Sequence, residues 1–237
     1  MAGSKLLAVF AHPDDETFRC GGTLALLARR GVHIQVLTAT RGEAGSCGSP
    51  PQCRTDELAA IREQELRRAC VALGIEPPRL MDYQDGHLSE ADPERIISEI
   101  LAVLREVRPQ VMLTYGPEGV SGHLDHIAIG QYATEVFHRA EDVAALYAIA
   151  VPQSLAAVMG IPRIRPVPDE SIALTVNVMP VWEAKLASIC CHRTQLSETP
   201  ILEAPPDRQR MFLGREHFRR LAWRGGRDFF ARLEMDR

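Results

Sequence analysis

One short run of this sequence carries side chains that can do chemistry. His12, Asp14 and Asp15 come directly after Leu6 to Phe10, an apolar stretch that predicts a buried strand. The carboxyl ends of strands in open α/β sheets are where ligands bind, because the loops there vary while the sheet holds them rigidly. The same run, with Glu16 behind it, is also a good helix N-terminus, where carboxylates cap free amides. Taken alone, it is either a site or a helix start.

A second run of the same side-chain types lies further along the chain. His123, Asp125 and His126 follow Val111 to Thr114, another predicted strand. Either histidine alone is more often a surface residue in the first turn of a helix than a ligand. Because both runs follow strands, they can meet at the carboxyl edge of one sheet. The pooled histidines and carboxylates are then enough for a metal held by two nitrogens and one oxygen.

The two runs also leave side chains for proton transfer. A metal lowers the pKa of bound water to about 7, but a base must still accept a proton during attack. Asp14 and Asp15 are adjacent in an irregular loop and point in different directions, so one can bind the metal while the other addresses the water. A histidine beyond coordination distance can then serve as an acid. The sequence predicts a metal-assisted reaction of water.

The elements that must position these runs alternate between strand-like and helix-like segments, which is the βαβ pattern. The predicted strands are Leu6 to Phe10, Val32 to Ala39, Arg79 to Tyr83, Val111 to Thr114, Ala145 to Ala150 and Ser171 to Val178. The predicted helices are Thr23 to Arg30, Asp56 to Leu73, Asp92 to Arg108, one ending near Arg139, and Val181 to Cys191. Pro162 to Pro168 reads as a loop or flap. We expect a Rossmann-like three-layer α/β/α fold with a mainly parallel sheet, formed as a single domain over residues 1–237.

Composition limits the function classes. The 27 basic and 31 acidic residues give a net charge of -4, which offers no electrostatic case for a nucleic-acid partner. No apolar stretch is long enough to span a bilayer, and the first residues lack the pattern of a signal peptide, so we expect a cytoplasmic protein without a membrane partner.

The six cysteines are expected to be reduced thiols, with a pairing of Cys47 and Cys53 as the alternative. No Gly-x-Gly-x-x-Gly motif follows the first predicted strand, which argues against a nicotinamide-dependent oxidoreductase. Gly21 and Gly22 are expected to let the first helix pack closely.

The strings AHPDDE (residues 11–16) and GHLDH (residues 122–126) resemble the motifs of the PIG-L or LmbE-like metal-dependent N-deacetylases. Further matches include the segments 41–45, 85–86 and 192–195, so that the resemblance covers most of the chain. The resemblance implies that His12, Asp15 and His126 bind zinc and that Asp14 is the general base. It also implies that His123 is the acid or oxyanion stabiliser, oriented by Asp125.

The resemblance further suggests substrate contacts. Arg62 and Asp85 match positions that look like sugar contacts, although a surface helix charge or a turn residue is the alternative. Glu43 can touch substrate, brace Arg62 or form a structural salt bridge. His192 lies either near the pocket or at a helix C-cap, and Glu16 is expected to be only a helix-start charge.

The function that the resemblance implies is the removal of an N-acetyl or similar N-acyl group from an amino sugar, such as a GlcNAc derivative, by water that Zn2+ activates, with Fe2+ as the alternative metal. A catalytically inactive carbohydrate- or metal-binding module is the alternative. Homo-oligomers are common in the family. One departure from the mycothiol-pathway enzymes is Ser121, where they carry a tyrosine; Tyr115 is a candidate substitute.

Overall fold

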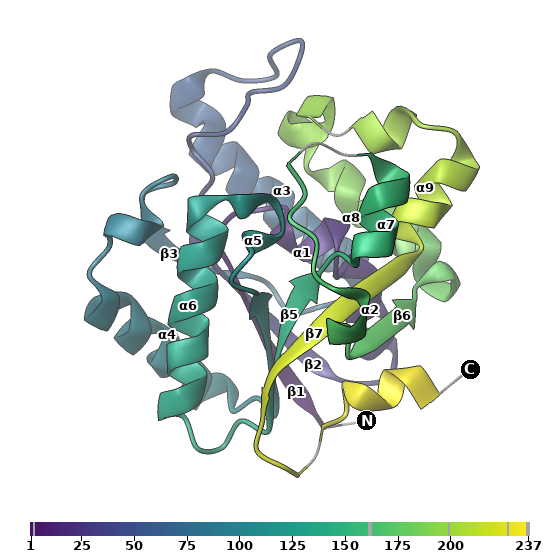
Figure 1. Cartoon of the computed structure of the whole chain (residues 1–237). Coiled ribbons are helices and arrows are strands. Elements are labelled where there is room, and N and C mark those ends of the chain that lie inside the picture. The colour runs from purple at the N-terminus through teal and green to yellow at the C-terminus, as the bar shows by residue number, and fades with distance from the viewer. Residues whose placement is uncertain (2, 161–162, 199, 227, 236–237) are drawn as a thin grey trace.

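The described residues form one seven-stranded sheet at the centre of the fold (Figure 1). The structure is a computed structural model that describes residues 1, 3–160, 163–198, 200–226 and 228–235. The strands are β1 (Lys5–Phe10), β2 (His33–Thr40), β3 (Arg79–Tyr83), β4 (Val111–Tyr115), β5 (Ala145–Ala150), β6 (Leu174–Asn177) and β7 (Arg215–Trp223). Their order is β3-β2-β1-β4-β5-β7-β6. The first five pair in parallel, whereas β7 runs antiparallel to β5 and β6. The predicted mainly parallel sheet is confirmed.

Helices cover both faces of this sheet (Figure 1). They are α1 (Asp15–Phe18), α2 (Gly21–Arg29), α3 (Leu58–Leu73), α4 (Pro93–Val107), α5 (Gly119–Gly122), α6 (Leu124–Arg139), α7 (Gln153–Met159), α8 (Trp182–Cys191) and α9 (Pro206–Leu213). α4 and α6 pack together on one face, and α2, α3 and α8 on the other. The predicted three-layer arrangement is therefore present. None of the described helices is both long enough and apolar enough to cross a membrane.

The sequence analysis did not predict β7. Its charged residues stand in two adjacent pairs, Arg215–Glu216 and Arg219–Arg220, so the segment resembles a solvated surface, yet Phe218 is completely buried. The predicted strand Ser171 to Val178 is shorter in the structure and forms the edge strand β6. Of the predicted flap, Pro162 lies outside the described residues, while Val167 forms an isolated parallel bridge with Pro152. All six cysteines are free thiols, as expected.

β1 and β4 are neighbours, with Ala8 aligned with Leu113. Both strands are completely or almost completely buried along their length, because helices cover both faces of the sheet. The residues that follow each strand therefore emerge at the same edge, which brings together two runs more than a hundred positions apart in the sequence.

Gly22 is the point of closest approach between α2 and the segment that follows β6. A Cβ atom at this position would lie 2.7 Å from Cγ1 of Val178. We expect Gly22→Ala to lower the free energy of unfolding by about 1–3 kcal/mol, because overpacking displaces neighbouring groups. Gly21→Ala is the matched control with a smaller expected loss, since its nearest neighbour would be 3.1 Å away. Guanidinium denaturation of both variants measures the difference, and equal midpoints would contradict the packing argument.

Candidate metal centre

A cleft of about 330 Å³ opens at the carboxyl ends of β1 and β4. Both chemically active runs of the sequence reach it. The residues that line it are His12, Asp14, Asp15, Ala44, Gly45, Arg62, Asp85, Gly86, His123, His126 and Gln195. The structure thus brings together most of the predicted site residues, whereas Glu43 and Asp125 lie behind the cleft wall.

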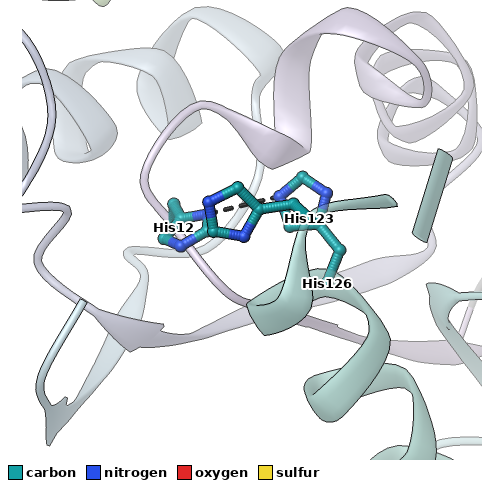
Figure 2. A group of neighbouring side chains, drawn as sticks. All are labelled: His12, His123 and His126. Carbon is teal, nitrogen blue, oxygen red and sulfur yellow. Dashed lines mark hydrogen bonds between the residues drawn. The ribbon is translucent and has the colours of Figure 1, made fainter. Parts of the chain in front are cut away.

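Three side-chain groups converge at the centre of the cleft. Nδ1 of His12 lies 3.2 Å from Nε2 of His126, as the dashed line in Figure 2 marks. That same Nε2 atom lies 3.2 Å from Oδ1 of Asp15, and Oδ2 of Asp15 lies 3.9 Å from Nδ1 of His12. Ligand atoms about 2.0–2.2 Å from a tetrahedral zinc ion are themselves roughly 3.3 Å apart. The two distances of 3.2 Å from Nε2 of His126, to Nδ1 of His12 and to Oδ1 of Asp15, match this spacing, whereas the 3.9 Å between Oδ2 of Asp15 and Nδ1 of His12 is longer.

The second nitrogen of each ring has its own partner. Nε2 of His12 lies 2.9 Å from Oδ1 of Asp85 and 3.1 Å from Oδ2 of Asp125. Nδ1 of His126 faces the carbonyl oxygen of Gly119 at 3.1 Å. Histidines that bind metals usually donate their other N–H to a carboxylate or carbonyl, which fixes the tautomer. These contacts leave Nδ1 of His12 and Nε2 of His126 as the nitrogens available to a cation.

The electrostatics of the cleft also favour positive charge. Burial alone would lower the pKa of His12, but hydrogen bonds with Asp125 and Asp85 raise it to about 10. Burial alone would raise the pKa of Asp15, yet the adjacent His126 and His12 hold it below its ordinary value. A cation placed between these groups would contact the ionised carboxylate of Asp15, with the carboxylates of Asp85 and Asp125 nearby.

Two groups of side chains in the described residues have all their ligand atoms within metal-binding distance of one another. One is His12, His123 and His126, and the other is His12, Asp85 and Asp125. Figure 2 shows the three histidine rings gathered at the cleft. The two carboxylates of the second group face Nε2 of His12, which is not the nitrogen that faces His126. Asp15 also accepts backbone N–H groups, from Ala11 and His12, but only through Oδ2, and its Oδ1 lies 3.2 Å from Nε2 of His126. Beside His126, His123 is therefore the rival of Asp15 as the third ligand.

Asp14 immediately precedes α1, which begins at Asp15, so the run is a helix start as well as part of the cleft, although the side chain of Asp14 makes no capping hydrogen bond. The carboxylates of Asp14 and Asp15 have different partners, Arg62 for Asp14 and His126 for Asp15. Its backbone φ of 109° lies in the left-handed region, which costs a non-glycine residue energy. Glu16 stabilises this conformation by accepting the N–H of Asp14 at 3.0 Å. Oδ2 of Asp14 lies 3.2 Å from Nη2 of Arg62. Burial raises the pKa of Asp14, although Arg62 acts in the opposite direction.

Arg62 is buried and braces the cleft from α3. Its guanidinium donates to the backbone carbonyls of Gly42 and Pro13 in addition to Asp14. Within the described residues Glu43 forms none of the three expected contacts: it does not line the cleft, does not pair with Arg62 and forms no structural salt bridge. Its Oε1 instead accepts the N–H of Asp85 at 2.8 Å, since the turn directs its side chain toward the loop after β3.

The expected pairing of Asp125 with His123 is wrong. The backbone N–H of Asp125, not its carboxylate, contacts Nδ1 of His123 at 3.2 Å, and the carboxylate faces His12. Residues two positions apart at the start of a helix do not face each other. The pKa of His123 is lowered, by partial burial first and then by His12 and His126. The backbone contact assigns the ring proton to Nε2, which makes His123 a neutral hydrogen-bond donor.

Glu16 is more than a charge at a helix start, which corrects the prediction. It is completely buried, and its Oε1 lies 2.6 Å from Nε2 of His192. His192 is the C-cap residue of α8, which confirms that alternative, and it is completely buried and does not line the cleft. Burial lowers its pKa, but Glu16 more than compensates and raises it. The sequence signal was the match of residues 192–195, which carried no information on the partner.

Tyr115 cannot replace the missing tyrosine at position 121. Its ring stacks on His126 with centroids 4.1 Å apart, and its hydroxyl hydrogen-bonds to the carboxylate of Asp15. Ser121 is exposed on α5. Tyr115 therefore supports two of the converging groups and is not a free donor in the cleft.

Comparison with known proteins agrees with this geometry. Residues 7–137 match the family described as PIG-L, GlcNAc-PI de-N-acetylase. A 1D-myo-inositol 2-acetamido-2-deoxy-alpha-D-glucopyranoside deacetylase from Thermobifida fusca (strain YX) is 32% identical over 244 residues, with 83% of this chain and 85% of that protein covered. A protein from Bacillus cereus (strain ATCC 14579), named "Probable N-acetyl-alpha-D-glucosaminyl L-malate deacetylase 2", is 32% identical over 194 residues, with 80% and 83% covered.

A similar fold occurs in a solved structure. The N,N'-diacetylchitobiose deacetylase from Pyrococcus horikoshii superimposes with a TM-score of 0.66 at 21% identity, covering 92% of this chain and 84% of that one. At this identity the likeness shows the fold alone.

Proposed function

Because the chain belongs to the PIG-L, GlcNAc-PI de-N-acetylase family, we propose that it is a metal-dependent hydrolase that removes an N-acetyl group from an amino sugar. The single observation that carries this proposal is the convergence of His12, His126 and Asp15, with atoms 3.2–3.9 Å apart, beside Asp14 in an open cleft. The names of the relatives share an N-acetylglucosaminyl group and differ in the aglycone, inositol in one and L-malate in another.

The residues present suit a catalytic zinc ion. His12 through Nδ1, His126 through Nε2 and Asp15 through a carboxylate oxygen would hold it, which is the three-ligand set of many catalytic zinc sites. Two nitrogens and one carboxylate also suit ferrous iron. When bound, such an ion lowers the pKa of water and polarises a carbonyl group.

The remaining side chains in the cleft account for proton transfer and charge stabilisation. Asp14 accepts the proton of the attacking water, and its raised pKa brings it closer to neutrality, where a general base works best. His123 donates its Nε2–H to the oxygen of the amide carbonyl as negative charge develops there. As the C–N bond breaks, the proton held by Asp14 passes to the departing amine, and the products are acetate and a free amino sugar.

Three further residues act around these groups. Arg62 holds Asp14, and Asp85 holds His12, while both line the cleft where they can meet sugar hydroxyl groups. Glu43 acts only through Asp85, whose N–H it accepts. The alternative of an inactive binding module gains no support, since Asp14 and His123 are not needed for binding alone.

Acetate release tests the proposal directly. The protein purified without chelator is assayed for metal content and for acetate produced from methyl N-acetyl-α-D-glucosaminide. We expect about one metal ion per chain and turnover that a chelator abolishes and added Zn2+ restores. Stoichiometric metal without turnover of any N-acetyl sugar would favour the binding module, and a protein that never binds metal would overturn the mechanism.

A substitution at Asp125 tests whether this residue orients His12 without binding the metal itself. Asp125→Asn replaces an acceptor oxygen by an NH2 group, so that either the contact with Nε2 of His12 or the one with a backbone N–H is lost, and Asp85 alone then faces Nε2 of His12. We expect metal affinity to fall by about 10- to 100-fold, which is typical when a group orienting a metal-bound histidine is changed. Competition with a chromogenic chelator measures the affinity, and Asp142→Asn, at an exposed position, is the control. Equal affinity in both variants would show that Asp125 does not orient His12.

A further inference from the structure

Arg165 lies beside the turn that carries the cleft histidines. Its guanidinium covers Gly122, the residue before His123, so closely that a Cβ at Gly122 would be 2.7 Å from Nη2 of Arg165. Gly122 also has φ +76°, so a side chain there would be strained as well as crowded. The volume that a side chain at position 122 would fill is therefore occupied by an arginine more than forty residues away in the sequence.

The backbone around Arg165 is fixed. The N–H of Arg165 donates to the carbonyl of Val120 at 2.7 Å, and the N–H of Val167 donates to Val151 at 2.9 Å. Val167 also forms a bridge with Pro152 at the end of β5. In Figure 1 the segment after α7 runs beside α5, in agreement with these bonds. The side chain thus lies against Gly122, next to the cleft residue His123, on an anchored segment, which lowers the entropy lost when it binds a partner.

The guanidinium of Arg165 has no acidic partner among the described residues. Other arginines near the cleft do have one: Arg62 pairs with Asp14, and Arg41 pairs with Asp82 and Glu63. Arg165 is exposed to solvent. A guanidinium presents paired N–H donors whose geometry matches a carboxylate or a phosphate, and such charge-assisted pairs are about twice as strong as neutral ones.

We propose that Arg165 is a specificity-determining residue that selects amino sugars whose aglycone carries an anionic group, a carboxylate or a phosphate. This inference rests on the proposed function, since it places the acetamido group at the metal centre and the aglycone at the rim beside His123. The anionic group lies at the rim because the carboxylates deeper in the cleft would repel it.

Four glycosides and four proteins test the inference. The substrates are the methyl, carbamoylmethyl, carboxymethyl and phosphoethyl N-acetyl-α-D-glucosaminides, in which the carbamoyl group is a neutral match for the carboxylate. The proteins are the wild type, Arg165→Ala, Arg165→Glu and Arg163→Ala, which removes the same charge from the same exposed segment. We expect the wild type to prefer an anionic glycoside over its neutral match by about tenfold in kcat/KM, mainly through KM. The preference should weaken with added salt.

Every result of this experiment either supports or overturns the inference. Arg165→Ala should abolish the preference and Arg165→Glu invert it, while Arg163→Ala keeps it, and the better of the two anionic substrates identifies the group recognised. Turnover without an anionic preference, or a preference that survives in Arg165→Ala, overturns the inference and leaves the proposed function standing. If the wild type cleaves none of the four substrates, the proposed function fails and the inference falls with it.

Discussion

Asp14→Asn should lower kcat for acetate release by about three orders of magnitude while the protein keeps its metal, since a positioned general base typically contributes 10²- to 10⁴-fold. The variant keeps the shape of the side chain and an oxygen that can face Nη2 of Arg62, but it cannot accept a proton. Asp14 itself makes none of the contacts that join His12, His126 and Asp15. Steady-state kinetics and metal analysis of the same preparation measure both quantities.

The control for this experiment is Asp82→Asn. Asp82 is exposed and pairs only with Arg41 at the surface, so its amide variant should match the wild type. A fully active Asp14→Asn would show that another group accepts the proton. Loss of metal in Asp14→Asn would instead move Asp14 from the base to the ligand set.

Asp15→Asn should lose the metal and, with it, more than about 10³-fold of kcat/KM, since a Lewis-acid metal contributes several kcal/mol to the transition state. The amide keeps an oxygen that can accept the N–H groups of Ala11 and His12, so the loop retains its hydrogen bonds. What the variant removes is the negative charge beside His126. Metal content after dialysis against a metal buffer checks the prediction.

His123→Ala is the comparison that decides between the two rival ligand sets. We expect this variant to retain stoichiometric metal and to lose activity, since the ring is the oxyanion donor and not a ligand. The opposite pattern, with metal kept in Asp15→Asn and lost in His123→Ala, would assign the site to His12, His123 and His126. Circular dichroism of both variants confirms that the fold is intact.

Sequence patterns predicted the parallel part of the sheet well, because buried strands and the helices between them have local periodicity. The ranges Arg79 to Tyr83 and Ala145 to Ala150 coincide with β3 and β5. β7 was missed because its charged and apolar residues do not alternate, and its position next to β5 depends on pairing with residues about seventy positions away. Local signals carry no information of that kind.

The sequence by itself determined which residue types stand at the carboxyl edge of the sheet, because two histidine and carboxylate runs each follow a predicted strand of the parallel sheet. Only the tertiary structure decided that these strands, β1 and β4, are neighbours and which side chain faces which. Asp125 turns to His12 and not to nearby His123, Glu16 meets His192 across 176 positions, and Arg165 covers Gly122. The physical reason is that burying a charge requires a partner, and in a folded chain the partner that lies within reach is set by packing and not by spacing along the sequence.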